Sequence, residues 1–273
     1  MSPFSLTRPL ILSVLLAGAV GSAGAQTFYF NDGRKASMPE ARVSGTNIVV
    51  QIKLSGAEGG TAETSLPIAK LIRIDWPAPE ELLQAEASLR AGKADEALAK
   101  IEPLLPSQEP LLAVPGSWWF RGAAVKLAAH AQKGQTTEAN AFMERLRLLK
   151  APATVLNAGE LALIDQAVTD SSPDSITARL AALKIEADDD AGLAGVELIK
   201  GRVHEKADRT EEALLAYLRV SVYYPSATAV MPRALLGSSR CYRKLKDEVR
   251  AKAALETLRK NFPDAPEAAS AKP

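Results

Sequence analysis

The sequence predicts a mainly α-helical protein, an α-solenoid of stacked helical hairpins preceded by a small antiparallel β module of SH3-like type. Three observations lead to this expectation. An alanine-based helical pattern recurs four times, and residues 201–263 contain a repeat with a 38-residue period. Residues 27–76 contain β-branched and aromatic runs bounded by turn signals.

The helical pattern consists of an alanine, a large or apolar residue four positions later, and another apolar residue three positions after that. Because an α-helix has about 3.6 residues per turn, these positions lie on one helix face. The four sets are Ala97, Ile101 and Leu104; Ala139, Met143 and Leu146; Ala213, Tyr217 and Val220; and Ala251, Leu255 and Leu258. The position twelve residues before each alanine lies in another helical stretch, so each set predicts a pair of helices.

The clearest repeat relates residues 201–225 to residues 239–263. Seven small, bulky or proline positions match at a constant offset of 38. The pairs are Gly201 and Ser239, His204 and Tyr242, Ala213 and Ala251, Tyr217 and Leu255, Val220 and Leu258, Tyr224 and Phe262, and Pro225 and Pro263. Small residues let two helices approach closely and bulky ones fill the remaining space, so the repeat predicts two consecutive helical hairpins.

These repeats resemble the tetratricopeptide (TPR) family. Its 34-residue helix pair places a small residue and an aromatic in the first helix, then alanine, a bulky residue and a closing proline in the second. The resemblance covers about 79–150 and 191–265 and departs from the pattern at Leu127 and His204. The longer period is similar to that of exported outer-membrane assembly and Tol-Pal accessory proteins. The resemblance implies a helical scaffold that binds proteins.

Capping and turn signals predict where the first helices begin and end. Pro79 followed by Glu80 and Glu81 predicts a helix start, because proline suits the first turn and acidic residues favour the positive end of the helix dipole. The partner helix is expected to end near its two prolines, at 103–106. The next pair is expected to begin around 117–119.

Residues 153–190 are less regular. We expect helices over 159–168 and 174–187, as a degenerate repeat in which Ala178, Ala182 and Ile185 keep the helical spacing. The run Asp188-Asp189-Asp190 lacks the spaced ligands of a calcium loop, so a helix start or solvated turn is favoured over a metal site.

Residues 26–77 are predicted to form the separate β domain, between a signal peptide (1–25) and the helical repeat domain (78–273). Asn31-Asp32-Gly33 is a strong turn signal after an aromatic strand, and Asn47–Leu54 is β-branched. Three to five short strands are expected. Such a small unit is marginal alone, so it should pack on the first helical pair, with Trp76 and Pro77 near the junction.

The N-terminus has the pattern of an export signal. Arg8 supplies positive charge, an apolar run begins at Pro9, and Ala23-Gly24-Ala25 forms a small-x-small cleavage pattern before Gln26. The apolar run is short for a bilayer about 30 Å thick, which favours a cleaved signal over a retained anchor. Gln26 is not a cysteine, so no lipid anchor is expected there. A periplasmic or secreted chain without a stable membrane span is predicted.

The charge balance gives no sign of a polyanion-binding protein. The chain has 33 basic and 32 acidic residues and a net charge of +1. We therefore expect no nucleic-acid partner. Cys241 is the only cysteine, which excludes an intramolecular disulfide, and its helical surroundings predict a buried small side chain.

Common catalytic motifs are absent from the sequence. It has no H-E-x-x-H, C-x-x-C, G-x-S-x-G, S-x-x-K or phosphate-loop pattern. The two histidines, His130 and His204, fall at equivalent packing positions of first helices. Most carboxylates lie at helix starts, where the dipole accounts for them. No enzyme activity, cofactor or metal is expected, although a hydrolase with two unpatterned carboxylates stays open.

The predicted function is that of an exported, non-catalytic scaffold that binds a protein or peptide in the cell envelope. First helices of stacked repeats would line a concave face. The predicted partner-binding residues there are Arg202, Lys206, Leu236, Arg240, Arg243 and Lys244, with Leu198 and Glu205 beside them. Arginines could hold a carboxylate or an acidic peptide through paired hydrogen bonds, and a solvated helix face is the alternative.

A cell-wall glycan-binding module is the alternative function. It would use the β segment and the pair Trp118 and Trp119, since aromatic rings can form a sugar platform. The pair Tyr223 and Tyr224 could act in the same way. In each pair, however, packing of one ring between helices is the favoured interpretation.

Overall fold

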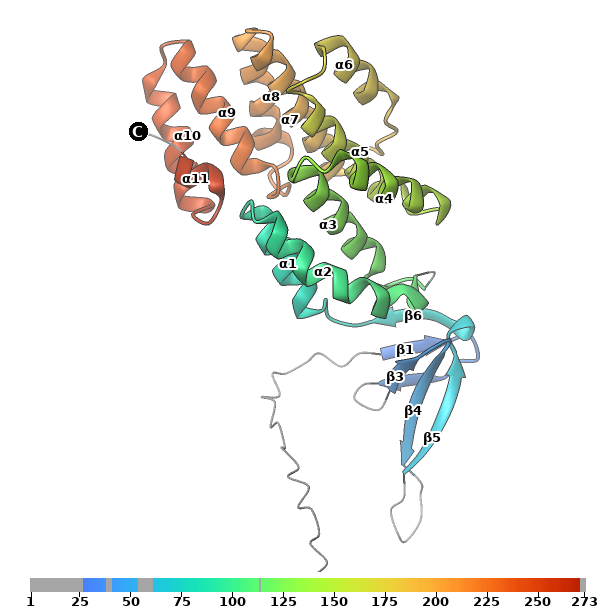
Figure 1. The fold of residues 1–273 in the computed structure, drawn as a ribbon. Coiled ribbons are helices and arrows are strands. Elements are labelled where there is room, and N and C mark those ends of the chain that lie inside the picture. The colour runs from blue at the N-terminus through green and yellow to red at the C-terminus, as the bar shows by residue number, and fades with distance from the viewer. Residues whose placement is uncertain (1–26, 38–40, 54–60, 113, 271–273) are drawn as a thin grey trace, which may run out of the picture.

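The computed structural model describes residues 27–37, 41–53, 61–112 and 114–270. The predicted signal peptide lies outside these residues. The described chain begins with two small antiparallel sheets and continues as a packed array of helices, as predicted (Figure 1). This confirms a mainly α fold with an N-terminal β unit.

The β unit consists of two three-stranded antiparallel sheets, ordered β2-β1-β6 and β3-β4-β5. The strands are β1 (Thr27–Phe30), β2 (Lys35–Ser37), β3 (Ala41–Ser44), β4 (Asn47–Lys53), β5 (Thr61–Pro67) and β6 (Leu71–Asp75). The prediction of three to five strands was wrong for the described residues. β2 and β3 have three and four residues, too few for a recognisable β-branched run. An SH3-like closure of the two sheets stays a prediction.

The helices pair into consecutive hairpins. They are α1 (Glu80–Arg90), α2 (Ala94–Gln108), α3 (Trp119–Gln132), α4 (Thr136–Leu148), α5 (Ala153–Ala167), α6 (Pro173–Ala182), α7 (Asp190–Lys206), α8 (Thr210–Tyr223), α9 (Met231–Lys244), α10 (Glu248–Asn261) and α11 (Pro266–Ser270). The odd-numbered helices from α1 to α9 contact one another in succession, and each is followed by its hairpin partner. This is the stacking of a solenoid.

The β unit packs against the loop between α2 and α3. Leu111 and Val114 of this loop share one core with Phe28 and Phe30 of β1. The Trp76 indole donates to the carbonyl of Gly116 at 2.7 Å. Gly116 has a φ of 90°, and a Cβ there would overlap the carbonyl oxygen of Ile74. Trp76 therefore lies at the junction as expected, but the packing surface is the loop that follows the first helical pair.

The recurring alanines face the interior, as the helical pattern predicts. Ala97, Ala139, Ala213 and Ala251 are each 0% exposed. Their bulky followers at the fourth position are buried as well. Cys241 is also buried, and burial raises the pKa of its thiol to about 11. Small buried side chains thus set the close spacing of paired helices.

The 38-residue repeat has equivalent backbone geometry in its two copies. α8 and α10 begin and end at the same offset of 38, at 210–223 and 248–261. Asp208 and Lys246 hold equivalent positions in the turns before these helices, with φ of 57° and 61°. The sequence repeat is therefore a structural repeat.

The prediction that the second helix ends near 103–106 was wrong. α2 continues through Pro103 and Pro106 to Gln108. Leu105 is 7% exposed and Leu111, which follows the helix, is 0% exposed. Burial of this apolar face outweighs the local cost of the prolines.

The predicted spacing in the third hairpin was also wrong. The second helix of that hairpin, α6, ends at Ala182 rather than 187, so Ile185 lies beyond it. Ala178 and Ala182 are exposed. α6 instead packs through Ile176 and Leu180, which are buried. The aspartate run does start a helix, because the Asp189 side chain accepts a hydrogen bond from the amide of Gly192 at 2.9 Å.

Replacing Ala251 with leucine should lower the free energy of unfolding by about 1–3 kcal/mol, because the added atoms overpack a position without free space. Urea denaturation measures the change. Ala253→Leu on the exposed side of the same helix is the matched control and should have little effect. Equal stability of Ala251→Leu and the wild type would contradict the assigned packing.

Candidate functional site

The inner side of the helical array encloses a groove of about 860 Å³. Its lining comes from α1, α3, α5 and α7, from the start of α9, and from residues 261–267, which run from the end of α10 into α11. Gly92, in the turn after α1, lies close to α11, since a Cβ added there would stand 3.4 Å from Pro266 Cγ. The first hairpin and the C-terminal segment therefore meet beside the groove (Figure 1).

Small side chains leave the groove open. Ala87 of α1, Ala128 of α3, Ala158 of α5 and Gly195 of α7 all line it. Apolar clefts with a few polar groups are typical ligand sites. An α-helix about 10 Å across would fill this volume in about two turns. The groove is therefore large enough for a short polypeptide segment.

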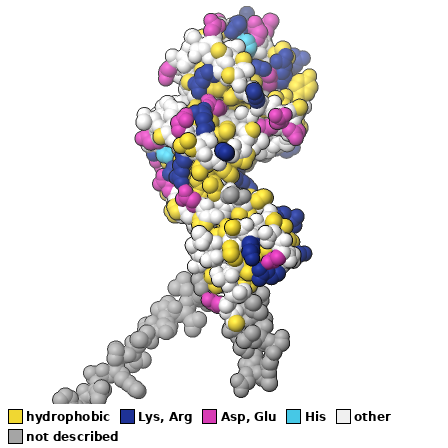
Figure 2. Space-filling model, turned by 90° about the vertical axis from the view of Figure 1, so that its right-hand side faces the viewer, with side chains coloured by type: hydrophobic (Ala, Val, Ile, Leu, Met, Phe, Trp, Pro, Cys, Tyr) yellow, Lys and Arg dark blue, Asp and Glu magenta, His cyan; other side chains and the backbone are white. Residues whose placement is uncertain are grey.

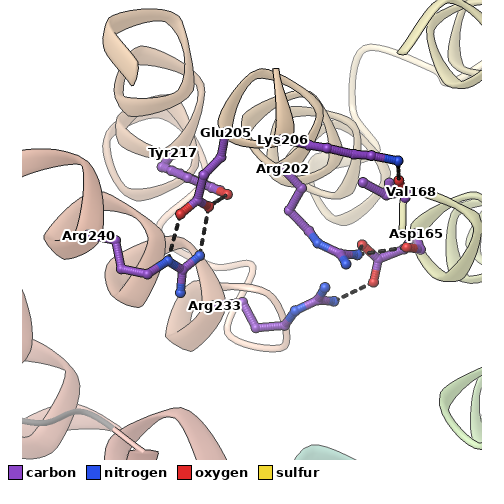
Figure 3. Close-up of polar contacts among 8 residues, drawn as sticks. All are labelled: Asp165, Val168, Arg202, Glu205, Lys206, Tyr217, Arg233 and Arg240. Atoms are coloured by element: carbon purple, nitrogen blue, oxygen red, sulfur yellow. Dashed lines mark hydrogen bonds and ion pairs between the residues drawn. The ribbon is translucent and has the colours of Figure 1, made fainter. Parts of the chain in front are cut away.

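An ion-pair cluster forms the polar part of the lining. Asp165 of α5 accepts a hydrogen bond from Arg202 of α7 and pairs with Arg233 of α9, whose Nη1 lies 2.6 Å from Asp165 Oδ2 (Figure 3). Arg202 Nη1 also donates to the backbone carbonyl of Asp165 at 2.7 Å. Because three successive first helices contribute, the cluster joins the third, fourth and fifth hairpins.

The carboxyl group of Asp165 is held in its ionised form. Burial raises the pKa of Asp165, but the charges and hydrogen bonds of Arg233 and Arg202 outweigh the burial. The pKa of Asp165 is therefore lower than usual. Two guanidinium groups share the Asp165 carboxylate, and the carboxylate of Glu267 lies in the same lining near Arg233, so the charges of this part of the groove balance.

A second polar set joins α7, α8 and α9. Arg240 donates to the two carboxylate oxygens of Glu205 through Nε and Nη2, at 2.7 Å each. The Tyr217 hydroxyl donates to Glu205 at 2.7 Å (Figure 3). Burial raises the pKa of Glu205, yet the bonds from Arg240 and Tyr217 hold it below its usual value.

Lys206 caps the end of the third hairpin's first helix. Its Nζ donates to the backbone carbonyls of Val168, Thr169 and Ser171, at 2.9, 2.6 and 3.0 Å. Carbonyls at a helix C-terminus have no partner within the helix, so a lysine there is stabilising. The ammonium group of Lys206 thus has a structural role.

The structure brings only part of the predicted site together. Arg202 lines the groove, and Lys206 lies at a smaller hollow of about 300 Å³ beside it. The predicted residues of α9 are absent from the groove lining; these are Leu236, Arg240, Arg243 and Lys244. Only the start of α9 reaches the groove, and Lys244 pairs with Asp208 at 3.0 Å. Contact of these six residues with a partner stays a prediction.

Sequence reasoning missed Asp165 and Arg233. The two residues belong to different hairpins, and no local spacing relates them. One signal was present, since Asp165 follows the apolar run Leu161–Ile164 inside a helix. A charged residue at such a place needs a partner when it is buried.

The tryptophan pair does not form an exposed platform. Trp119 is 1% exposed and packs edge-to-face against Phe120, with ring centroids 5.3 Å apart. Trp118 is half-buried, with its ring beneath the guanidinium of Arg121 at 5.3 Å. The part of the glycan-binding alternative that uses Trp119 is therefore wrong. Among the tyrosines, Tyr223 is 67% exposed and Tyr224 packs in the core, as expected for such a pair.

The histidines occupy packing positions in first helices. His130 is 9% exposed, and its Nδ1 lies 2.8 Å from Gln135 Oε1. His204 is half-buried, and burial together with the charge of Arg209 lowers its pKa. Within residues 27–270, apart from the undescribed gaps, no cluster of three potential metal ligands occurs. In the same residues, no helix has the length and apolar character needed to span a bilayer.

The comparison with protein families identifies the last hairpin. Residues 233–265 match the tetratricopeptide repeat family. This tetratricopeptide repeat comprises nearly all of α9, all of α10 and the residues before α11. Such repeats are typically non-catalytic scaffolds for protein–protein interaction, and the packed helical array fits a TPR-like fold. A search of curated proteins found no match to the chain.

Acid should weaken the helical array through Asp165 and Glu205. A carboxyl whose pKa is lower in the folded state stabilises that state above its ordinary pKa, near 4, and this contribution is lost as the pH falls through the folded value. The free energy of unfolding should therefore fall below about pH 4. Urea denaturation at pH 7, 5 and 3 measures it. Asp165→Asn should show a smaller fall, and an unchanged pH slope would contradict the role of this cluster.

Proposed function

We propose that this chain is an exported, non-catalytic scaffold that binds a short segment of a partner protein in the groove. The observation that carries this proposal is the groove, which is lined by small apolar residues of four first helices and holds the ion-pair cluster of Asp165, Arg202 and Arg233. The tetratricopeptide repeat at 233–265 supports a protein as the ligand, because these repeats serve protein–protein interaction.

The groove is already formed without a partner. Asp165, Arg202 and Arg233 link three hairpins, and Arg240 with Glu205 links two of them again. A rigid site loses little conformational entropy on binding, which favours affinity. The guanidinium groups of Arg202 and Arg233 would offer hydrogen bonds to a polar group of the bound segment, such as a backbone carbonyl or a carboxylate.

The cell envelope is the proposed location. Arg8, the apolar run from Pro9 and the Ala23-Gly24-Ala25 pattern support export. The period of the repeats is similar to that of outer-membrane assembly and Tol-Pal accessory proteins. We therefore place the partner in the periplasm or at a membrane that faces it. Fractionation of cells with detection of the processed chain tests this location, and a cytoplasmic chain that keeps residues 1–25 would contradict it.

Site-specific photo-crosslinking in cells tests the groove. A photoreactive amino acid at position 158, in the groove, should capture a protein partner, which mass spectrometry identifies. The same amino acid at position 178 is the matched control, because Ala178 is an exposed helical alanine outside the groove lining. Ala158→Trp, which fills the groove, should abolish capture from a second groove position, 128, at unchanged melting temperature. Equal capture from positions 158 and 178, or turnover of a wall substrate by the purified chain, would overturn the proposal.

A further inference from the structure

Three side chains form one row across the outer face of the β2-β1-β6 sheet. Tyr29 of β1 is paired in register with Lys35 of β2 on one side and with Arg73 of β6 on the other. Cross-strand partners project from the same face of a sheet. The Lys35 ammonium lies 5.1 Å and the Arg73 guanidinium 4.4 Å from the centre of the Tyr29 ring. Two cations thus hold one half-buried aromatic ring.

The cations near this row outnumber the acids. Arg73 pairs with Asp75 at 2.7 Å and Arg34 pairs with Asp32 at 2.6 Å, so these four charges cancel. Lys70 lies beside the β1–β2 turn, where its carbonyl accepts a hydrogen bond from the amide of Asn31 at 2.8 Å. Within the described residues, no ion pair joins Lys35 or Lys70 to a carboxylate. Counted over the described residues on and beside this row, about two positive charges have no carboxylate partner, one at Lys35 and one at Lys70.

Lys and Arg side chains are gathered at the level of this sheet in Figure 2, in contrast to the mixed signs over the helices above it. Arg73 is 56% exposed, and the neighbouring Ile72 is 55% exposed. Tyrosine suits a membrane interface because its ring is apolar and its tip is polar. Lysine and arginine extend charged ends from apolar stems in the same setting.

From this arrangement we infer that the outer face of the β2-β1-β6 sheet docks on anionic lipid headgroups. The complementary charge is the phosphate layer, which Lys35 and Lys70 would face while Tyr29 lies at the headgroup level. β1 begins at Thr27, so this sheet is the described part nearest in sequence to the apolar run that begins at Pro9. The inference is separate from the proposed ligand of the groove.

Vesicle partitioning tests the docking surface. The chain from Gln26 onward retains every described residue and lacks the apolar run, which would itself enter lipid. It should co-sediment with vesicles of phosphatidylcholine containing phosphatidylglycerol, and much less with phosphatidylcholine alone. Each lysine near an anionic surface contributes about 5-fold in partitioning, so Lys35→Ala with Lys70→Ala should lower it on the order of 30-fold. Raising the salt to about 1 M should have a similar effect, because the Debye length shrinks to about 3 Å.

The matched control removes the same charge from the other end of the molecule. Lys252 and Lys260 are exposed on α10, so Lys252→Ala with Lys260→Ala should leave partitioning nearly unchanged. Three results would overturn the inference: equal partitioning of the wild type into neutral and anionic vesicles, an equal loss in the α10 control, or no loss in the Lys35 and Lys70 variant. Melting temperatures confirm that the variants are folded. Because crosslinking from position 158 uses other residues, failure of either experiment leaves the other interpretable.

Discussion

Replacing Tyr217 with alanine is expected to lower the free energy of unfolding by about 3–5 kcal/mol. The Tyr217 side chain is 1% exposed and reaches from α8 to the backbones of α7 and α9. A Cβ added at Gly201 or at Gly237 would stand 2.5 Å from the Tyr217 ring. The ring therefore fills the space between two glycines of successive first helices, and its removal would leave a large cavity. Chemical denaturation of the full chain measures the loss.

Two further variants show how much of this loss is due to the Tyr217 ring. One removes only its hydroxyl, and the other removes a different tyrosine from the same helix. Tyr217→Phe keeps the ring and loses one hydrogen bond to Glu205, so it should cost about 1 kcal/mol. Tyr223→Ala removes a 67% exposed tyrosine from the same helix and should stay within about 0.5 kcal/mol of the wild type. If Tyr217→Ala were no more destabilising than Tyr223→Ala, the assigned packing of the fourth and fifth hairpins would be incorrect.

Trp119→Ala should produce a loss of similar size, about 3–5 kcal/mol. Trp119 is 1% exposed in the core formed by the first two hairpins, where it also contacts Phe142 at a ring-centroid distance of 6.4 Å. The guanidinium of Arg145 lies 5.6 Å from the Trp119 ring, so the substitution also removes a cation–π contact. Thermal and urea denaturation of the variant would show the loss.

The neighbouring Trp118 provides the control for this prediction. Trp118 is half-buried, and among the described residues its indole N–H has no hydrogen-bond partner. Trp118→Ala should therefore destabilise less than Trp119→Ala. The destabilisation by these two substitutions also tests the glycan-binding alternative. A stable Trp119→Ala variant that had lost binding to peptidoglycan would mean that Trp119 serves a ligand rather than the core.

The charged residues of the helical array act mainly between repeats. Arg202, Arg240 and Lys206 were expected to face a partner, yet each bonds to a neighbouring hairpin. Partly buried ion pairs between successive repeats fix their relative rotation, and that rotation shapes the groove. A mutation at Arg202 would therefore alter both stability and groove shape, so Ala158→Trp is the cleaner test of binding.

The sequence by itself determined the helical hairpins and their packing faces. The recurring alanines, the 38-residue period and the bulky residue at the fourth position are local features, because helix geometry relates residues three, four and seven positions apart. It also determined the existence of the β unit and its junction near Trp76. The packing of the third hairpin was not predicted, because α6 packs through Ile176 and Leu180 and not through the expected alanine positions.

Only the tertiary structure decided which side chains meet across repeats and across strands. The contact of Asp165 with Arg202 and Arg233 depends on how three hairpins rotate relative to one another, which no local period encodes. The row of Lys35, Tyr29 and Arg73 depends on strand register between segments that are separated by most of the β unit. A nearly neutral composition gave no indication of that local charge. Side-chain contacts between distant segments are set by packing and register, and these are properties of the folded chain.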